Sequence, residues 1–176
     1  HILITDYRMT EANDILPIMT LLANKNINNL VIICEDIETS ALATVIVNKM
    51  QGKFNAVAVN APGSGDDRTI LLEDIAKMTG GRVFTVRKGD KLENVQIEDL
   101  GRANRFISRK DSSVIIGPKG DKTEIAKAMD DLNLAITNAL TEKDRELFKH
   151  RLGRFSGKVG IIKCGAATEQ EEKALR

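Results

Sequence analysis

The chain has 176 residues and a formal net charge of +1, and its 42% hydrophobic and 29% charged residues are typical of one globular domain. The nearly neutral charge and the 3% aromatic content argue against a basic or base-stacking surface, so no nucleic-acid partner is expected. No apolar run reaches the roughly 18 residues of a membrane-spanning helix, so no membrane partner is expected either.

The first half of the chain alternates predicted strands with predicted helices. Apolar or alternating runs predict strands at residues 1–5, 30–34, 54–59 and 83–86. Capping residues and helical spacing predict helices at about 13–24, at 40–50, and from Asp66 to the glycine pair 80–81. This alternation favours a parallel or mixed sheet covered by helices.

The second half contains a strand pair, two helices and a last strand. The strand pair is predicted at 105–109 and 113–116. Apolar residues spaced four, three and four apart predict a helix around 125–136, and a capping-box pattern starts another at 141–155. We expect these two helices to form an αα-hairpin, followed by a strand at 159–164.

Two glycine-rich loops match nucleotide-binding motifs only in part. Residues 63–68 begin like a dinucleotide fingerprint, but the third glycine is absent, and Asp66 and Asp67 would repel a phosphate. Residues 117–122 lack the spacing and the Ser or Thr of a P-loop. We favour a plain turn for both loops, and keep a nucleotide- or small-ligand-binding α/β domain as the alternative function.

No group of residues in the sequence indicates a catalytic or metal centre. His1 and His150 are the only histidines, and no His, Cys or carboxylate cluster has metal-ligand spacing. No Ser or Cys lies in a nucleophile-elbow context. Cys34 and Cys164 lie inside apolar runs and are interpreted as buried thiols of a reducing compartment. We expect no catalytic residue, no metal and no cofactor in this chain.

The helices predicted at 13–24 and 40–50 are apolar around most of their circumference. After its cap, the second helix has only Thr44, Asn48 and Lys49 as polar residues. A helix on one face of a sheet needs only a narrower apolar stripe. Either both helices are buried on two sides, or part of each is exposed and binds apolar segments of a partner. Burial in a subunit interface is a further interpretation.

Several motifs occur in an order and at a spacing known from one protein family. Residues 35–50 read EDIETSALATVIVNKM, and further motifs follow at 61–68 (APGSGDDR), 72–76 (LEDIA), 79–81 (TGG), 98–101 (EDLG) and 163–169 (KCGAATE). Over nearly its whole length the chain resembles the apical domain of GroEL-type (group I) chaperonins. We therefore expect it to be a piece of such a chaperonin.

The resemblance implies an α/β fold of the GroEL apical-domain type, with layered β-sheets flanked by helices and a C-terminal αα-hairpin. Residues 1–158 would form the apical domain, which binds substrate and co-chaperonin, and residues 159–176 the start of the returning intermediate domain. The function implied is that of a molecular chaperone, part of an ATP-driven protein-folding ring in the bacterial cytoplasm or an organellar matrix.

The resemblance also implies a set of binding residues. By position, the family's binding residues correspond to Leu16, Met19, Leu42, Ile46, Val47 and Asn48. In a groove between the two helices they would hold exposed hydrophobic segments of non-native polypeptides, and the same groove would take the mobile loop of a GroES-type co-chaperonin. The amide of Asn48 would hydrogen-bond a client backbone. The full-length protein would be a homo-oligomeric ring, whereas this chain alone would be monomeric.

The sequence departs from the family pattern at several points. The family's aromatic groove residues lie upstream of His1, and Ser64 and Asp67 replace an aromatic and a basic residue that are frequent in the family. The full-length chaperonin that the chain resembles is an ATPase that uses ATP and Mg, and the resemblance implies that its catalytic residues lie outside this chain. Glu169 matches a position used in salt bridges between subunits.

Overall fold

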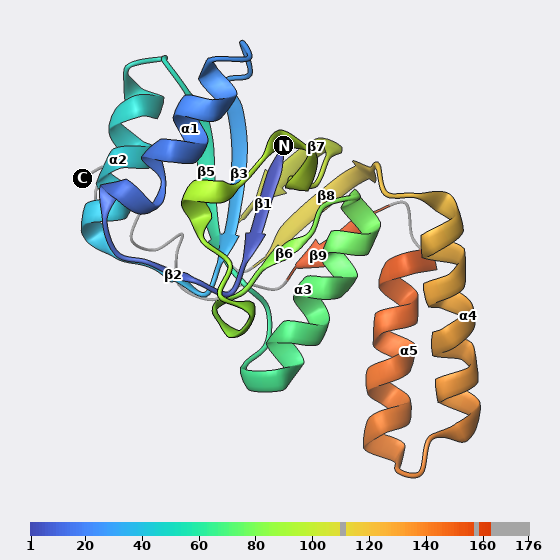
Figure 1. The fold of residues 1–176 in the computed structure, drawn as a ribbon. Helices are drawn as coiled ribbons and strands as arrows, with labels where there is room; N and C mark the ends of the chain where they lie inside the picture. Colours follow the sequence, from blue (N-terminus) through green and yellow to red (C-terminus); the bar gives the residue numbers. More distant parts are fainter. Residues whose placement is uncertain (110–111, 157–158, 163–176) are drawn as a thin grey trace.

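The computed structural model describes residues 1–109, 112–156 and 159–162. Its centre is a parallel sheet of four strands in the order β5-β3-β1-β6 (Figure 1). These strands are β1 (Ile2–Thr5), β3 (Asn29–Cys34), β5 (Asn55–Asn60) and β6 (Val83–Phe84). Parallel neighbours need a crossover connection, which explains why helices separate the strands along the sequence.

Three helices cover the two faces of this sheet. The buried residues of α1 (Leu16–Ala23) and α2 (Thr39–Met50) share one core cluster with Leu3 of β1. Leu72, Ile75 and Ala76 of α3 (Gly65–Thr79) share another cluster with Ile4. Leu3 and Ile4 belong to different clusters because successive side chains of a strand point to opposite faces. The predicted parallel sheet flanked by helices is confirmed.

A second, antiparallel sheet lies on the α3 side of the first. It consists of β7 (Ala103–Ser108), β8 (Ser113–Pro118) and β9 (Val159–Ile162). An isolated bridge pairs Ile2 of β1 with Gly101, which lies just before β7. A Cβ on Gly101 would lie 2.3 Å from the hydroxyl oxygen of Thr79, so only glycine allows this close approach.

Two long helices follow β8 and lie side by side at one edge of the molecule (Figure 1). They are α4 (Lys122–Asn138) and α5 (Glu142–Ser156). Leu132 of α4 and Phe155 of α5 form a separate apolar cluster with Met78 of α3. This cluster holds the two helices against the sheet body.

Short elements complete the described chain. A two-residue parallel pair is formed by β2 (Arg8–Met9) and β4 (Asp36–Ile37). Four 3-10 turns occur in the described ranges: η1 (Ala12–Asp14), η2 (Val86–Lys88), η3 (Leu92–Asn94) and η4 (Ile97–Asp99). None of the described helices is long and apolar enough to cross a bilayer.

At two of the boundaries that differ from the sequence expectation, a side chain explains the difference. The helix predicted from residue 13 is divided into η1 and α1, because the Asp14 carboxylate accepts the backbone N–H groups of Thr10 (2.8 Å) and Glu11 (3.0 Å) and closes a separate turn. The strand predicted to end at residue 86 ends at Phe84, because the next residue, Thr85, caps η2 through its side-chain oxygen.

Some expectations fall on residues outside the described ranges. The motif at 163–169, with Cys164 and Glu169, lies there, so neither the expected burial of this cysteine nor the expected salt bridge of this glutamate is tested. Of the strand predicted at 159–164, the described part is β9, residues 159–162. The division into domains at residue 158 stays a prediction.

Candidate functional site

The two helices on one face of the sheet, α1 and α2, carry almost no charge. α1 contains no charged residue, and α2 contains only Lys49. A helix that lies on the surface of a globular protein normally carries charged residues on its solvent side, as α4 and α5 do here. The solvent side of α1 and α2 therefore departs from the usual pattern.

Two of the six predicted binding residues are exposed on this side. Leu16 of α1 is 40% exposed, and Val47 of α2 is 48% exposed. Met50, three residues after Val47 and so on the same side of the helix, is 73% exposed. Sequence reasoning gave Met50 no role, although its spacing from Val47 was a signal for one. We call Leu16, Val47 and Met50 the apolar face.

Met19 and Leu42 were expected on the same exposed surface, but both are buried, each with only 5% of its area exposed. They belong to the core cluster between the helices and the sheet, together with Leu22 and Val45. Residues three apart in a helix share a side, so each pair, Met19 with Leu22 and Leu42 with Val45, points toward the sheet. The expected exposure of Met19 and Leu42 is therefore wrong.

Ile46 and Asn48 are half-buried. Ile46 packs against the core cluster with part of its side chain. The Nδ2 of Asn48 donates a hydrogen bond to the backbone oxygen of Thr44 (2.8 Å), one turn earlier in α2. That bond uses one of the two N–H groups, so Asn48 would meet a partner's backbone through its second N–H or its side-chain oxygen. The binding role of both residues stays a prediction.

The glycine-rich loop at residues 63–68 is held together by hydrogen bonds from Arg68. Arg68 donates two hydrogen bonds to the backbone oxygen of Gly63 (3.0 and 3.2 Å) and forms an ion pair with Glu35 (3.1 Å). Asp66, in the first turn of α3, forms an ion pair with Arg87 (2.9 Å). Both arginines near the loop are thus engaged with acceptors of the chain itself, in keeping with a turn that leads into a helix.

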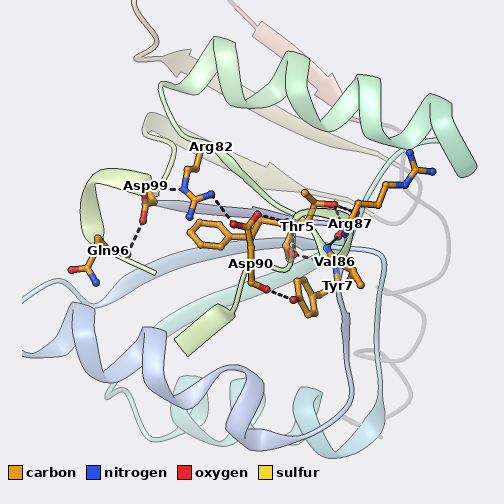
Figure 2. Close-up of polar contacts among 11 residues, drawn as sticks. Thr5, Tyr7, Arg82, Val86, Arg87, Asp90, Gln96 and Asp99 are labelled. Atoms are coloured by element: carbon orange, nitrogen blue, oxygen red, sulfur yellow. Dashed lines mark hydrogen bonds and ion pairs between the residues drawn. The ribbon is translucent and has the colours of Figure 1, made fainter. Parts of the chain in front are cut away.

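A network of polar groups occupies the switch point between β1 and β6, where many doubly wound sheets bind ligands. Figure 2 shows Arg82 and Tyr7 on either side of Asp90. Arg82 donates to the Asp90 carboxylate (3.2 Å), and the Tyr7 hydroxyl donates to the Asp90 backbone oxygen. The hydroxyl of Thr85 donates to Asp6 (2.5 Å), and its backbone N–H donates to Asp90 (3.0 Å). The groups at this position bond to one another.

These contacts set the protonation of the network. The N–H of Thr85, and after it the guanidinium of Arg82, lower the pKa of Asp90 below its ordinary value. Burial, with the nearby Asp6 and Asp90 carboxylates, raises the pKa of the Tyr7 hydroxyl. Asp90 is therefore ionised and Tyr7 protonated near neutral pH. In the described part of the chain, no three His, Cys, Asp or Glu residues come together as metal ligands.

A hollow of about 550 Å³ lies at the amino ends of the sheet strands. Five asparagines contribute to its lining: Asn26, Asn28, Asn29, Asn55 and Asn104. None of the six predicted binding residues lines it. The hollow and the apolar face are therefore separate features.

Comparison with solved structures shows a chaperonin-like fold. The chain resembles the chaperonin gp146 from the bacteriophage EL 2 (Pseudomonas aeruginosa) in the presence of ATP-BeFx, with a TM-score of 0.58, 13% identity and 99% of this chain covered in crystal form II. For crystal form I, the TM-score is 0.56, the identity is 15% and 98% of this chain is covered. The chain spans only 35% and 34% of those chains, about a third of their length. No family model matches the chain.

Proposed function

Starting from the chaperonin-like fold, we propose that this chain is the apical domain of a group I chaperonin and that the apolar face binds exposed hydrophobic segments of non-native proteins. The observation that carries the proposal is the exposure of Leu16, Val47 and Met50 on two neighbouring helices that contain a single charged residue. Large apolar side chains on a charge-poor surface favour contact with apolar groups of a partner over contact with water.

The expected affinity of one chain is low. Burying a fully exposed large apolar side chain contributes about 1.5–3 kcal/mol, and each of these three is already partly covered. Ordering of the bound segment opposes the gain, so a single apolar face should bind at about micromolar strength or weaker. Several copies in a ring would raise the apparent affinity, because the second contact with the same client becomes intramolecular.

The wider setting is proposed from the sequence resemblance. In it, residues 1–158 act as the apical domain and residues 159–176 lead into the next domain of a homo-oligomeric ring. The co-chaperonin mobile loop competes with clients for the apolar face, and the ATP and Mg chemistry belongs to domains outside this chain. The cellular setting is the bacterial cytoplasm or an organellar matrix.

The first prediction tests the apolar face directly. The double variant Leu16→Glu/Val47→Glu should weaken binding of a chemically denatured, fluorescently labelled client by about tenfold or more, because two carboxylates would have to lose water on contact with apolar side chains. Fluorescence anisotropy measures the binding. Circular dichroism should show an unchanged fold, because both positions are already exposed.

A matched control places the same charges elsewhere. The double variant Leu134→Glu/Leu140→Glu changes two leucines that are 63% and 96% exposed, at α4 and just after it. It should bind the client as the unchanged chain does. If both double variants bind with equal strength, the apolar face is not the binding site and the proposed function is overturned.

A further inference from the structure

The end of the α1–α2 pair where both helices begin is acidic. Four carboxylates lie there, on Glu11, Asp14, Asp36 and Glu38, together with one cation, Arg8. Contacts bring them together: η1 packs against α2, and Arg8 forms ion pairs with Asp36 (2.8 Å) and Glu38 (3.4 Å). One guanidinium against four carboxylates leaves this end negative.

The opposite end, where both helices stop, is basic. Lys25 follows α1, Lys49 lies in the last turn of α2, and Lys53 follows α2. The two connections lie side by side, because the N–H of Asn55 donates to the backbone oxygen of Asn28 (2.7 Å). Neither connection contains an acidic residue, and within the described residues the three lysines form no ion pair. This end therefore stays positive.

The two charged ends act on a bound segment independently. α2 has 12 residues, which at about 1.5 Å per residue gives a length of about 18 Å. That length exceeds the Debye length of about 8–10 Å at ordinary ionic strength, so the charge of one end is screened at the other. A segment lying along the helices meets carboxylates where they begin, beside Leu16, and ammonium groups where they stop, beside Val47 and Met50.

We propose that the apolar face selects polypeptide segments in which charge is segregated, with basic residues at one end, acidic residues at the other and apolar residues between. The inference rests on the proposed function. The basic end of the segment lies against the carboxylates where the helices begin, and the acidic end lies against Lys25, Lys49 and Lys53. Exposed ion pairs each contribute little, so the charges act on selectivity more than on total affinity.

Three peptides with one apolar centre test the selectivity. The centre has about six residues, since an extended chain of that length spans about 20 Å. The first peptide carries two lysines at one end and two glutamates at the other, the second carries lysines at both ends, and the third carries glutamates at both ends. A peptide can bind in either direction, so the comparison tests the segregation of charge rather than its order along the sequence.

Anisotropy with the labelled peptides measures the result. At about 20 mM salt the segregated peptide should bind about three- to tenfold more tightly than either uniform peptide, a range set by a few exposed ion pairs. At about 0.5 M salt the difference should disappear, because ions screen exposed charges. This salt series uses the unchanged chain and so does not depend on the folding of any variant.

Reversing charges on the protein shows which lysines cause the charge selectivity. The triple variant Lys25→Glu/Lys49→Glu/Lys53→Glu makes both ends acidic, so the peptide with lysines at both ends should become the tightest. The matched control Lys122→Glu/Lys127→Glu/Lys143→Glu has the same net charge but changes exposed lysines of α4 and α5. It should keep the order of the unchanged chain.

The outcomes separate this inference from the proposed function. Equal binding of all three peptides at low salt, or an unchanged order in the triple variant, overturns the charge selectivity while the proposed function stands. If none of the three peptides binds, the proposed function itself fails, and the selectivity fails with it.

Discussion

Leu42 and Val47 show that burial separates core from candidate site within a single helix. They lie five residues apart in α2, yet Leu42 is 5% exposed and Val47 is 48% exposed. Leu42 contributes its transfer free energy to folding, since its contact with water is lost when the chain folds. Val47 keeps about half of its surface available for a partner. Residue type alone does not make this distinction.

Truncation of each side chain should therefore have different effects on stability. We expect Leu42→Ala to lower the free energy of unfolding by about 2–5 kcal/mol, through lost transfer energy and a cavity in the core. Val47→Ala should change it by no more than about 0.5 kcal/mol. Urea denaturation followed by circular dichroism measures both values. Equal losses at the two positions would show that Val47 also belongs to the core.

At the scale of elements, one buried ion pair ties α5 to α3. Arg151 donates to both carboxylate oxygens of Asp74 (2.7 and 2.9 Å), and their side chains are 18% and 3% exposed. Arg154, one turn later in α5, is near the same carboxylate, and burial lowers its pKa. Together with the apolar cluster around Phe155, this pair fixes the position of α4 and α5 on the sheet body.

Breaking this pair from one side should be costly. Arg151→Met leaves the Asp74 carboxylate buried without its bidentate partner, so we expect a loss of about 3–5 kcal/mol in the free energy of unfolding. The double variant Asp74→Leu/Arg151→Met removes both charges of the pair and should recover part of that loss, although it also removes the carboxylate near Arg154. Urea denaturation compares the three chains. A double variant as unstable as the single one would mean that the packing of Arg151, rather than its charge, holds α5.

At the scale of the whole molecule, the apolar face is small. Three partly exposed side chains on one surface provide only a few kcal/mol before ordering costs are subtracted. A role in holding non-native proteins therefore requires several copies that contact one client together. This agrees with the proposed ring, in which each chain supplies one weak contact.

Joining two copies should make the weak contact measurable. When the chain is fused to a dimeric coiled coil, its apparent affinity for a surface-bound denatured protein should rise by about tenfold or more, mainly through slower dissociation. Surface plasmon resonance compares the fused dimer with the monomer. The dimer carrying Leu16→Glu/Val47→Glu in both copies should lose the gain. Identical dissociation of monomer and dimer would contradict a multivalent mechanism.

Much of the fold follows from local patterns in the sequence. Apolar runs such as residues 30–34 predict buried strands, and capping residues with helical spacing predict the helices between them. The boundaries were less predictable where a side chain competes for backbone N–H groups, as Asp14 does at Thr10 and Glu11. Such competition depends on side-chain geometry that periodicity does not describe.

The sequence by itself determined that α1 and α2 are apolar and nearly free of charge, because that property is one of composition. Only the tertiary structure decided that Met19 and Leu42 face the sheet while Leu16 and Val47 face solvent. An apolar arc that covers most of a helix has no unique inner side until the sheet and the neighbouring helix pack against it. The physical reason is that burial depends on contacts between segments far apart in the sequence. The local periodicity of a helix contains no information about those contacts.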